Sequence, residues 1–275
     1  MFIEKNTVIL LLFLRKGSSE ITHVSTDIDN MKRARILGIP YDNLTTEEAL
    51  FNVEQLLRDG KSHTLVFLSF PLLMRSKRNK LLRVFLEESD LIIPTGTCMH
   101  WAAGFLKRPL KEHIDPSVFV KRLMVQSVEL GRNVYLFGGR GQTIDRAFSN
   151  LVREIPRLFV VGRYRGNYRK SDHENIISAI GKASPDYFFI GLGSPQEQIW
   201  IVQNREKIHA KIIVFIEGLF DVYAGNVRRG SHYGKRLNLE RVPKRDIFYP
   251  YAFKRAVRTP LFVLAVIFEK IFWKN

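Results

Sequence analysis

The sequence has little cysteine, few acidic residues and no apolar run of membrane-spanning length, and each shortage excludes some classes of function or site. The single cysteine, Cys98, excludes an intrachain disulfide framework and a cysteine-rich zinc site, and it fits a reducing compartment. Two apolar runs, residues 7–14 and 261–273, are both shorter than the roughly 20 residues that cross a bilayer as a helix. We therefore predict no membrane span.

Acidic residues are outnumbered by basic ones. The sequence contains 27 Asp and Glu and 43 Lys and Arg, which gives a formal charge of +16. Such an excess indicates a polyanionic partner, which is either nucleic acid, an anionic membrane surface or a phosphorylated substrate. A chain of 275 residues with 45% hydrophobic content can bury a full core, so disorder is not expected as its main state.

The pattern of an ordered domain begins at about Met31. Residues 1–30 join a short apolar run to a polar stretch with few hydrophobic residues, and we expect an N-terminal extension outside the fold. An α/β domain is expected at residues 31–227, followed by a C-terminal appendage at residues 228–275.

Within the domain, short apolar runs alternate with amphipathic segments. Several runs are apolar throughout, as is typical of strands covered on both faces. The rhythm predicts an α/β fold with a mostly parallel, Rossmann-like sheet and helices on both faces. Strands are expected at residues 34–39, 63–70, 90–94, 133–139, 158–164, 186–193 and 211–218. Helices are expected at residues 45–60, where Thr45 and Glu48 are spaced as a capping box, and near 74–88, 98–106, 116–130, 142–154, 172–183 and 195–208.

The turn Gly-Leu-Gly-Ser-Pro-Gln-Glu at residues 191–197 follows one of these strands. Ser194 is a candidate N-cap, with Pro195 at the first helical position and Glu197 reaching back to complete a capping box. Gly191 and Gly193 lack Cβ atoms, so they allow a ligand to approach the backbone at a helix start that favours phosphate. Helix capping and phosphate binding are both open readings of this turn.

Two further strand-to-helix turns also contain glycine and are candidates for ligand binding on the same grounds. Residues 136–143 contain Gly138, Gly139 and Gly141, but they lack the ending of a P-loop and the third glycine of a dinucleotide fingerprint. Residues 92–104 join a strand to a helix through Pro94, Thr95 and Gly96. In parallel sheets ligands bind beyond the carboxyl ends of strands, so these turns are the candidate site.

Together these segments carry a resemblance to a known family. Residues 189–208, FIGLGSPQEQIWIVQNREKI, are similar to the signature Gly-Leu-Gly-Ser-Pro-Lys-Gln-Glu-x-Trp-x-x-x-Asn-Arg of the WecG/TagA/CpsF glycosyltransferases (glycosyltransferase family 26). Residues 36–50, 134–151 and 216–230 resemble three other segments of that family, in the same order. The resemblance covers roughly residues 31–230.

The resemblance implies a reaction and its partners. The expected activity is transfer of N-acetylmannosamine or a similar sugar from a UDP donor to a lipid diphosphate-linked sugar in cell-surface polysaccharide synthesis. The resemblance also implies that no metal is required, and no cofactor is expected because the UDP-sugar is a substrate. The family works at the cytoplasmic membrane face, so a peripheral protein on the inner face of the membrane is expected. Whether the chain forms a homo-oligomer is left open.

Carried over residue by residue, the resemblance implies a set of substrate-binding positions. They are Gly138, Gly139, Gly191, Gly193, Ser194, Pro195, Gln196, Glu197, Gln198, Gly218, Phe220, Asp221, Arg228 and Arg229. The arginines are the expected diphosphate contacts, since guanidinium suits bidentate recognition, and Arg236 and Arg241 are weaker candidates for the same role.

The chain departs from the family at the expected catalytic base. The family's Pro-Asp-Gly is Pro-Thr-Gly here, and Thr95 does not titrate near neutral pH, so it cannot act as an ordinary general base. His100, Asp115 or Asp221 could supply the base instead, although Asp115 precedes Pro116 and would by default cap a helix. The other two readings are an altered donor or acceptor, and a chain that binds a sugar nucleotide or a partner without catalysis.

The charge excess is concentrated at the C-terminus. Residues 228–275 hold twelve Lys and Arg and three acidic residues, so +9 of the total charge of +16 lies there. An apolar, aromatic segment flanked by basic residues predicts interfacial contact with an anionic membrane, whereas a terminal helix docked on the core is the alternative. The Leu, Val, Ile and Phe content of this tail argues against a nucleic-acid interface.

Overall fold

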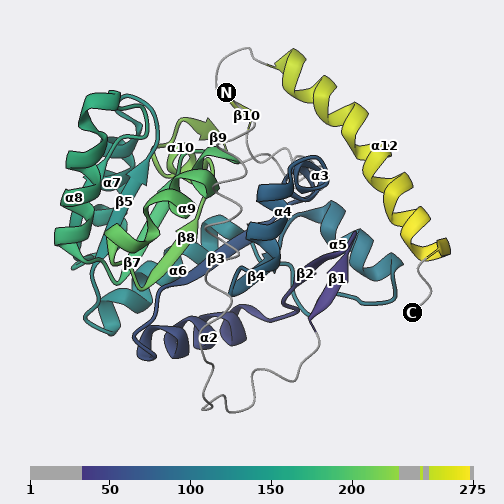
Figure 1. The fold of residues 1–275 in the computed structure, drawn as a ribbon, viewed down its shortest axis with the longest axis horizontal. Coiled ribbons are helices and arrows are strands. Elements are labelled where there is room, and N and C mark those ends of the chain that lie inside the picture. Colours follow the sequence, from purple (N-terminus) through teal and green to yellow (C-terminus); the bar gives the residue numbers. More distant parts are fainter. Residues whose placement is uncertain (1–32, 229–241, 244–247, 273–275) are drawn as a thin grey trace.

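A computed structural model describes residues 33–228, 242–243 and 248–272, with side chains described for residues 33–226 and 259–272. Its centre is a six-stranded parallel sheet in the order β4-β3-β8-β7-β5-β6 (Figure 1). The strands are β3 (His63–Leu68), β4 (Leu91–Pro94), β5 (Val134–Gly138), β6 (Val160–Tyr164), β7 (Tyr187–Gly191) and β8 (Ile212–Phe215). The predicted parallel α/β architecture is confirmed.

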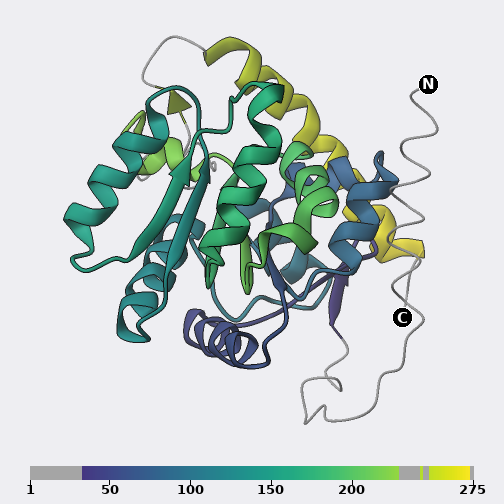
Figure 2. The same ribbon diagram turned by 60° about the vertical axis from the view of Figure 1, so that its left-hand side comes forward.

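Helices cover both faces of the sheet (Figures 1 and 2). One face packs against α3 (Phe70–Ser76), α4 (Lys80–Glu87), α5 (Thr97–Phe105), α8 (His173–Ala183) and α9 (Gln196–Ile208). The other packs against α2 (Thr46–Arg58), α6 (Pro116–Glu129), α7 (Thr143–Glu154) and α10 (Leu219–Tyr223). Successive strand residues alternate between the two cores, as Phe188 and Phe189 do. Both faces are therefore dry, which explains why the strands read as continuous apolar runs.

The predicted first strand, residues 34–39, is wrong as a member of the sheet. It forms instead a separate antiparallel hairpin of β1 (Ala34–Ile36) and β2 (Ile39–Tyr41). Leu37 and Gly38 connect the two strands with φ angles of 52° and 83°. Two successive residues with positive φ are the signature of the tight turn that reverses a chain in two residues. Gly38 is the sequence signal for this turn.

Two other predicted boundaries moved. The strand expected at residues 63–70 ends at Leu68, because Ser69 is the N-cap residue of α3. The single helix expected at residues 74–88 is two helices, since the Asn79 side chain accepts a hydrogen bond from the Leu82 backbone N–H and starts α4 there. The capping box of Thr45 and Glu48 is confirmed at the start of α2.

The C-terminal helix α12 (Phe248–Phe272) lies along one side of the domain (Figure 1). Phe262 and Val266 are fully buried, and the Phe262 ring lies 5.5 Å from that of Phe70. Glu269 accepts a hydrogen bond of 2.8 Å from the Leu37 backbone N–H. In the part of the chain that is described, no helix is both long and apolar enough to span a bilayer. The helix is thus docked on the core by one face.

Candidate functional site

The turns singled out in the sequence lie at one edge of the sheet. All six strands run parallel, so the segments that follow Leu68, Pro94, Gly138, Tyr164, Gly191 and Phe215 leave the sheet at the same carboxyl edge. In sheet order, Thr95 follows β4, Glu217 and Gly218 follow β8, and Gly193 follows β7. The structure therefore brings the predicted donor-side turns together on neighbouring strands.

The glycines at two of these turns have a packing role that the sequence does not reveal. A Cβ atom on Gly138 would lie 2.4 Å from the Gly191 carbonyl oxygen, and one on Gly191 would lie 2.7 Å from the Glu217 carbonyl oxygen. The Gly139 N–H donates to the same Gly191 oxygen at 3.2 Å. These glycines hold three turns in backbone contact, whereas Gly193, with φ of 85°, faces open space. Ligand binding by them stays a prediction.

The capping box expected at Ser194 and Glu197 is wrong. Helix α9 begins at Gln196 with Pro195 as its N-cap residue, and the Ser194–Pro195 peptide bond is cis. Because the helix begins one residue later than expected, the Glu197 carboxylate reaches Gly193 and accepts its N–H at 3.0 Å. The Glu197 N–H in turn donates to the Gly193 carbonyl at 3.2 Å. Glu197 thus closes the turn around Gly193.

Glu197 is also completely buried, although a glutamate near a helix start is usually exposed. Its side chain has no solvent exposure, and its second carboxyl oxygen accepts from the Gln198 amide at 3.2 Å. Burial, and after it the neighbouring Glu217 carboxyl group, raise the pKa of Glu197 to about 8, against the lowering effect of hydrogen bonds from the Gly193 and Leu192 N–H groups. Sequence reasoning placed this residue in the site but gave no signal for its burial.

Further polar atoms are buried beside this turn. The Ser194 hydroxyl oxygen and the Gln198 amide oxygen are out of contact with solvent and accept no hydrogen bond from the described residues. Arg75 of α3 donates to the Ser194 carbonyl at 3.2 Å, which ties the turn to the helix that follows β3. Of the predicted positions Gln196, Glu197 and Gln198, only Gln196 is exposed to solvent.

Asp221 belongs to a polar network between α7 and α10. Its carboxylate accepts from Asn226 at 3.2 Å and from the Thr143 hydroxyl at 3.5 Å, and Asn226 also donates to Thr143 at 3.1 Å. Phe220 is 1% exposed and contacts Gly191, so it is a core residue. The network fixes the start of α7 relative to α10, beside the turn that contains Gly139.

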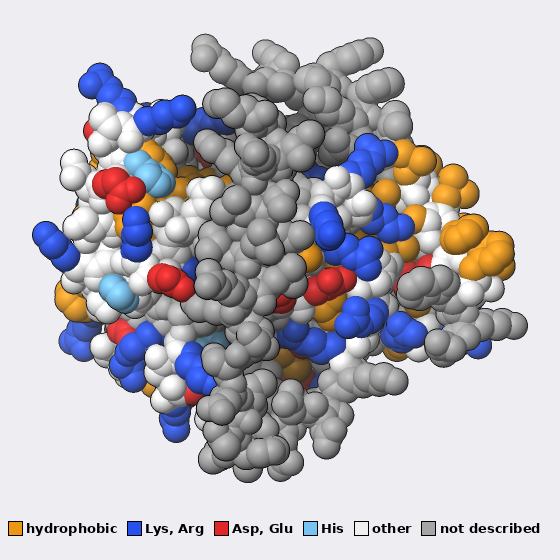
Figure 3. Space-filling model, viewed as in Figure 1, with side chains coloured by type: hydrophobic (Ala, Val, Ile, Leu, Met, Phe, Trp, Pro, Cys, Tyr) orange, Lys and Arg blue, Asp and Glu red, His pale blue; other side chains and the backbone are white. Residues whose placement is uncertain are grey.

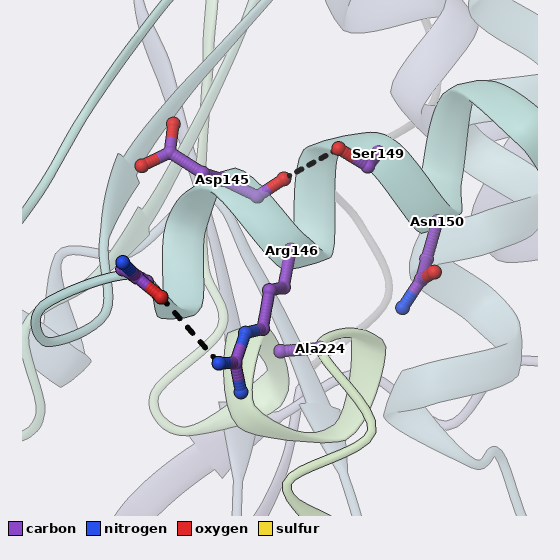
Figure 4. Close-up of a pocket in the computed structure, with 6 residues that line it drawn as sticks. Asp145, Arg146, Ser149, Asn150 and Ala224 are labelled. Atoms are coloured by element: carbon purple, nitrogen blue, oxygen red, sulfur yellow. Dashed lines mark hydrogen bonds between the residues drawn. The ribbon is translucent and has the colours of Figure 1, made fainter.

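A surface pocket of about 470 Å³ opens along α7, outside this cluster (Figure 4). None of the predicted site residues lines it. Arg146 is held there by the Gln142 side chain, at 3.4 Å, and the Ser149 hydroxyl donates to the Asp145 carbonyl at 3.0 Å. Its lining is Gln142, Asp145, Arg146, Ser149, Asn150 and Ala224. These contacts lie within one helix and do not converge on a ligand.

The three predicted catalytic positions have different surroundings. Thr95 is 7% exposed, and its N–H donates to the Leu68 carbonyl at 3.0 Å. His100 is exposed on α5, where its ring lies 6.0 Å from that of His113. Asp115 caps α6, because its carboxylate accepts from the Ser117 N–H at 2.7 Å and from the Ser117 hydroxyl at 2.6 Å. The capping role of Asp115 is confirmed, and it competes with a role as base.

The predicted diphosphate contacts lie mostly outside the described residues. Arg228 belongs to β9 (Val227–Arg228), which pairs with β10 (Val242–Pro243), but its side chain is outside the described part. Arg229, Arg236 and Arg241 also lie outside the described residues. The role of these arginines stays a prediction.

The outward side of α12 forms an apolar stripe. Its members, which are 46–64% exposed, are Leu261, Leu264, Phe268, Ile271 and Phe272. Trp101 of α5 is 41% exposed and stacks at 5.2 Å on Phe105, whose ring also lies 3.8 Å from the Lys270 ammonium. Figure 3 shows hydrophobic side chains gathered at this end of the molecule, with Lys and Arg beside them. One face of the helix is thus docked on the core and the other is exposed, and contact of the exposed face with a membrane stays a prediction.

Comparison with known proteins places these features in a family. The model of the "Glycosyl transferase WecG/TagA/CpsF family" matches residues 34–275. The N-acetylglucosaminyldiphosphoundecaprenol N-acetyl-beta-D-mannosaminyltransferase of Bacillus subtilis (strain 168) is 28% identical over 185 residues, which cover 67% of this chain and 71% of that protein. The protein of the same name from Staphylococcus aureus (strain NCTC 8325 / PS 47) is 22% identical over 213 residues, covering 77% and 83%.

Proposed function

Because the chain belongs to the WecG/TagA/CpsF family of glycosyl transferases, we propose that it transfers N-acetylmannosamine or a related sugar from a UDP donor to a lipid diphosphate-linked N-acetylglucosamine. The names of the Bacillus and Staphylococcus relatives support the sugar and the acceptor. The observation that carries the proposal is the gathering of the signature turn, residues 191–197, with turns of two other family segments, residues 134–151 and 216–230, at one edge of a parallel sheet.

The geometry of this edge suits the departure of a nucleoside diphosphate. In the transfer, an acceptor hydroxyl attacks the anomeric carbon, the bond to the donor diphosphate breaks, and negative charge grows on the UDP leaving group. The N-terminus of α9 lies at this edge, and the positive end of the helix dipole favours an anion there. Gly193 has no side chain and borders open space, so it does not block the approach of a ligand. We assign the donor diphosphate to this turn, with basic residues after Asn226 as further contacts.

Removal of the acceptor proton needs a group other than Thr95. A threonine hydroxyl stays protonated at neutral pH, and the carboxylate of Asp115 is engaged in capping α6. His100 is exposed and, unlike Asp115, does not cap a helix, so it is the base candidate that fits its surroundings best.

We further propose peripheral attachment to the inner, cytoplasmic face of the membrane. The apolar stripe of α12 and its flanking basic residues fit the interface of an anionic bilayer, where a lipid-linked acceptor is held.

The test is acceptor-dependent UDP release from a panel of UDP-N-acetylhexosamines, with a lipid diphosphate-linked N-acetylglucosamine analogue. Acceptor-dependent release by the wild type supports the transferase, and loss of release in His100→Ala then identifies the base. If the wild type binds the donor without turnover, and Thr95→Asp restores turnover, the result favours the second candidate, a non-catalytic sugar-nucleotide-binding protein. The substitution of the family's aspartate by Thr95 is the observation that supports this alternative.

A further inference from the structure

The carboxyl group of Glu197 controls the conformation of the turn that follows β7. The carboxylate accepts a hydrogen bond from the Gly193 N–H at 3.0 Å, and the backbone N–H of Glu197 donates to the Gly193 carbonyl at 3.2 Å, so the residue engages both polar backbone groups of Gly193. Gly193 has a φ of 85°, a region that residues with side chains rarely adopt, and a Cβ atom at this position would meet nothing within 4 Å. Glu197 therefore acts on the site through Gly193.

A second carboxylate approaches from the next strand. The turns after β7 and β8 are in backbone contact, since the Ile216 N–H donates to the Ile190 carbonyl at 2.9 Å and a Cβ on Gly191 would touch the Glu217 carbonyl. Glu217 is itself held at a φ of 44°, which costs free energy for a residue other than glycine. Two ionised carboxylates in this place would repel each other with no solvent at Glu197 to screen them.

Among the described residues, no basic side chain forms an ion pair with Glu197 that would offset that repulsion. From α3, Arg75 reaches the Ser194 carbonyl, so its hydrogen bond goes to the backbone of the turn. On α9 itself the basic residues Arg205 and Lys207 lie in the last turn, at the far end of the helix. Two buried acceptors, the Ser194 hydroxyl oxygen and the Gln198 amide oxygen, receive no hydrogen bond. A protonated carboxyl adds a donor among these groups, whereas an ionised one adds only another acceptor.

We propose that Glu197 is a positioning residue, which as a neutral, hydrogen-bonding acid holds the turn from Gly193 to Pro195 in the conformation that accepts an anionic donor. The inference rests on the proposed function for the identity of that donor, but the proton and the conformation of the turn are properties of the chain itself. Loss of the proton places a negative charge on the buried Glu197 carboxyl group, between the turns after β7 and β8. Both the turn and its affinity for a diphosphate then weaken.

The kinetic test compares wild type with Glu197→Gln, whose amide has the same shape and stays neutral. For wild type, kcat/KM for the UDP-sugar falls about tenfold for each pH unit above the pKa of Glu197, mainly through KM, and Glu197→Gln shows no such limb. Gln203→Glu is the matched control, because it adds a carboxylate to the exposed side of the same helix. It keeps the wild-type profile. A basic limb of equal size in Glu197→Gln overturns the inference.

A second measurement needs no turnover and separates this inference from the proposed function. Amide hydrogen exchange of the peptide spanning residues 190–200 is compared between wild type and Glu197→Gln at the same pH, so that the intrinsic rate cancels. Equal exchange at pH 6 and at least threefold faster exchange in wild type at pH 9 support the inference, even if no sugar transfer is found. Equal exchange at both pH values overturns it, even if the enzyme is active.

Discussion

Gly138 lies so close to Gly191 that a Cβ atom on residue 138 would come within 2.4 Å of the Gly191 carbonyl oxygen. The contact joins the turns after β5 and β7, which both belong to the candidate donor site. Neither backbone can yield easily, since the Gly139 N–H is hydrogen-bonded to the same oxygen.

Gly138→Ala is therefore expected to destabilise the fold by about 2–5 kcal/mol, from overpacking together with a φ of 146°. Gly141→Ala is the control, because Gly141 also has a positive φ, 53°, but faces open space, and about 1–2 kcal/mol is expected for it. Urea denaturation measures both. Equal losses would show that the contact with Gly191 contributes nothing beyond backbone strain.

Asp115→Asn separates capping from catalysis. Asparagine caps helices about as well as aspartate, so the free energy of unfolding is expected to change by less than about 0.5 kcal/mol, whereas Asp115→Ala loses about 1 kcal/mol. Turnover by Asp115→Asn is expected to stay within about twofold of wild type. A loss of a hundredfold or more, with stability kept, would make Asp115 the base.

Phe268→Ser is expected to reduce binding to vesicles that contain anionic phospholipid, because Phe268 is 60% exposed within the apolar stripe of α12. Phe159→Ser is the matched control, with 61% exposure at a site before β6, and it should bind like wild type. Vesicle co-sedimentation is the measurement. Equal reductions in the two variants would show that general hydrophobicity, and not the stripe, governs binding.

His63 makes the stability depend on pH. Burial disfavours its charged ring, but hydrogen bonds to Asp90 and Asp59, at 2.9 and 2.8 Å, outweigh this and raise the pKa of His63 above 6.5. The stabilisation is complete below the unfolded pKa and is lost as pH rises through the higher folded pKa. The destabilisation by His63→Gln is thus expected to be larger at pH 5.5 than at pH 8.5 in chemical denaturation, and equal values would show that folding does not raise the pKa of His63.

Glu197 makes the stability depend on pH over a different pH range. Its folded pKa of about 8 lies above the ordinary 4.5, so between these values the folded state binds more protons than the unfolded state. The stability of wild type relative to Glu197→Gln is therefore expected to fall by a few kcal/mol as pH rises from 4.5 to 8, and to change little beyond. A relative stability that is flat over this range would mean that Glu197 is ionised in the fold.

The helices and strands were largely predictable because each carries a local signal. Buried parallel strands such as β7 are apolar throughout, and α2 carries its own capping box in Thr45 and Glu48. The hairpin at Leu37 and Gly38 was missed because its two strands together look like one short apolar run. The order of the strands has no local signal, since it depends on which apolar faces meet in space.

The sequence by itself determined the parallel α/β class, the turns that line the carboxyl edge and the basic, apolar character of the C-terminus, because periodicity, glycine spacing and charge are all local properties. Only the tertiary structure decided which face of α12 is buried on Phe70 and which is left outside. It likewise decided that Glu197 is fully buried near Glu217, because burial and the field of a neighbouring charge arise only when distant segments pack together.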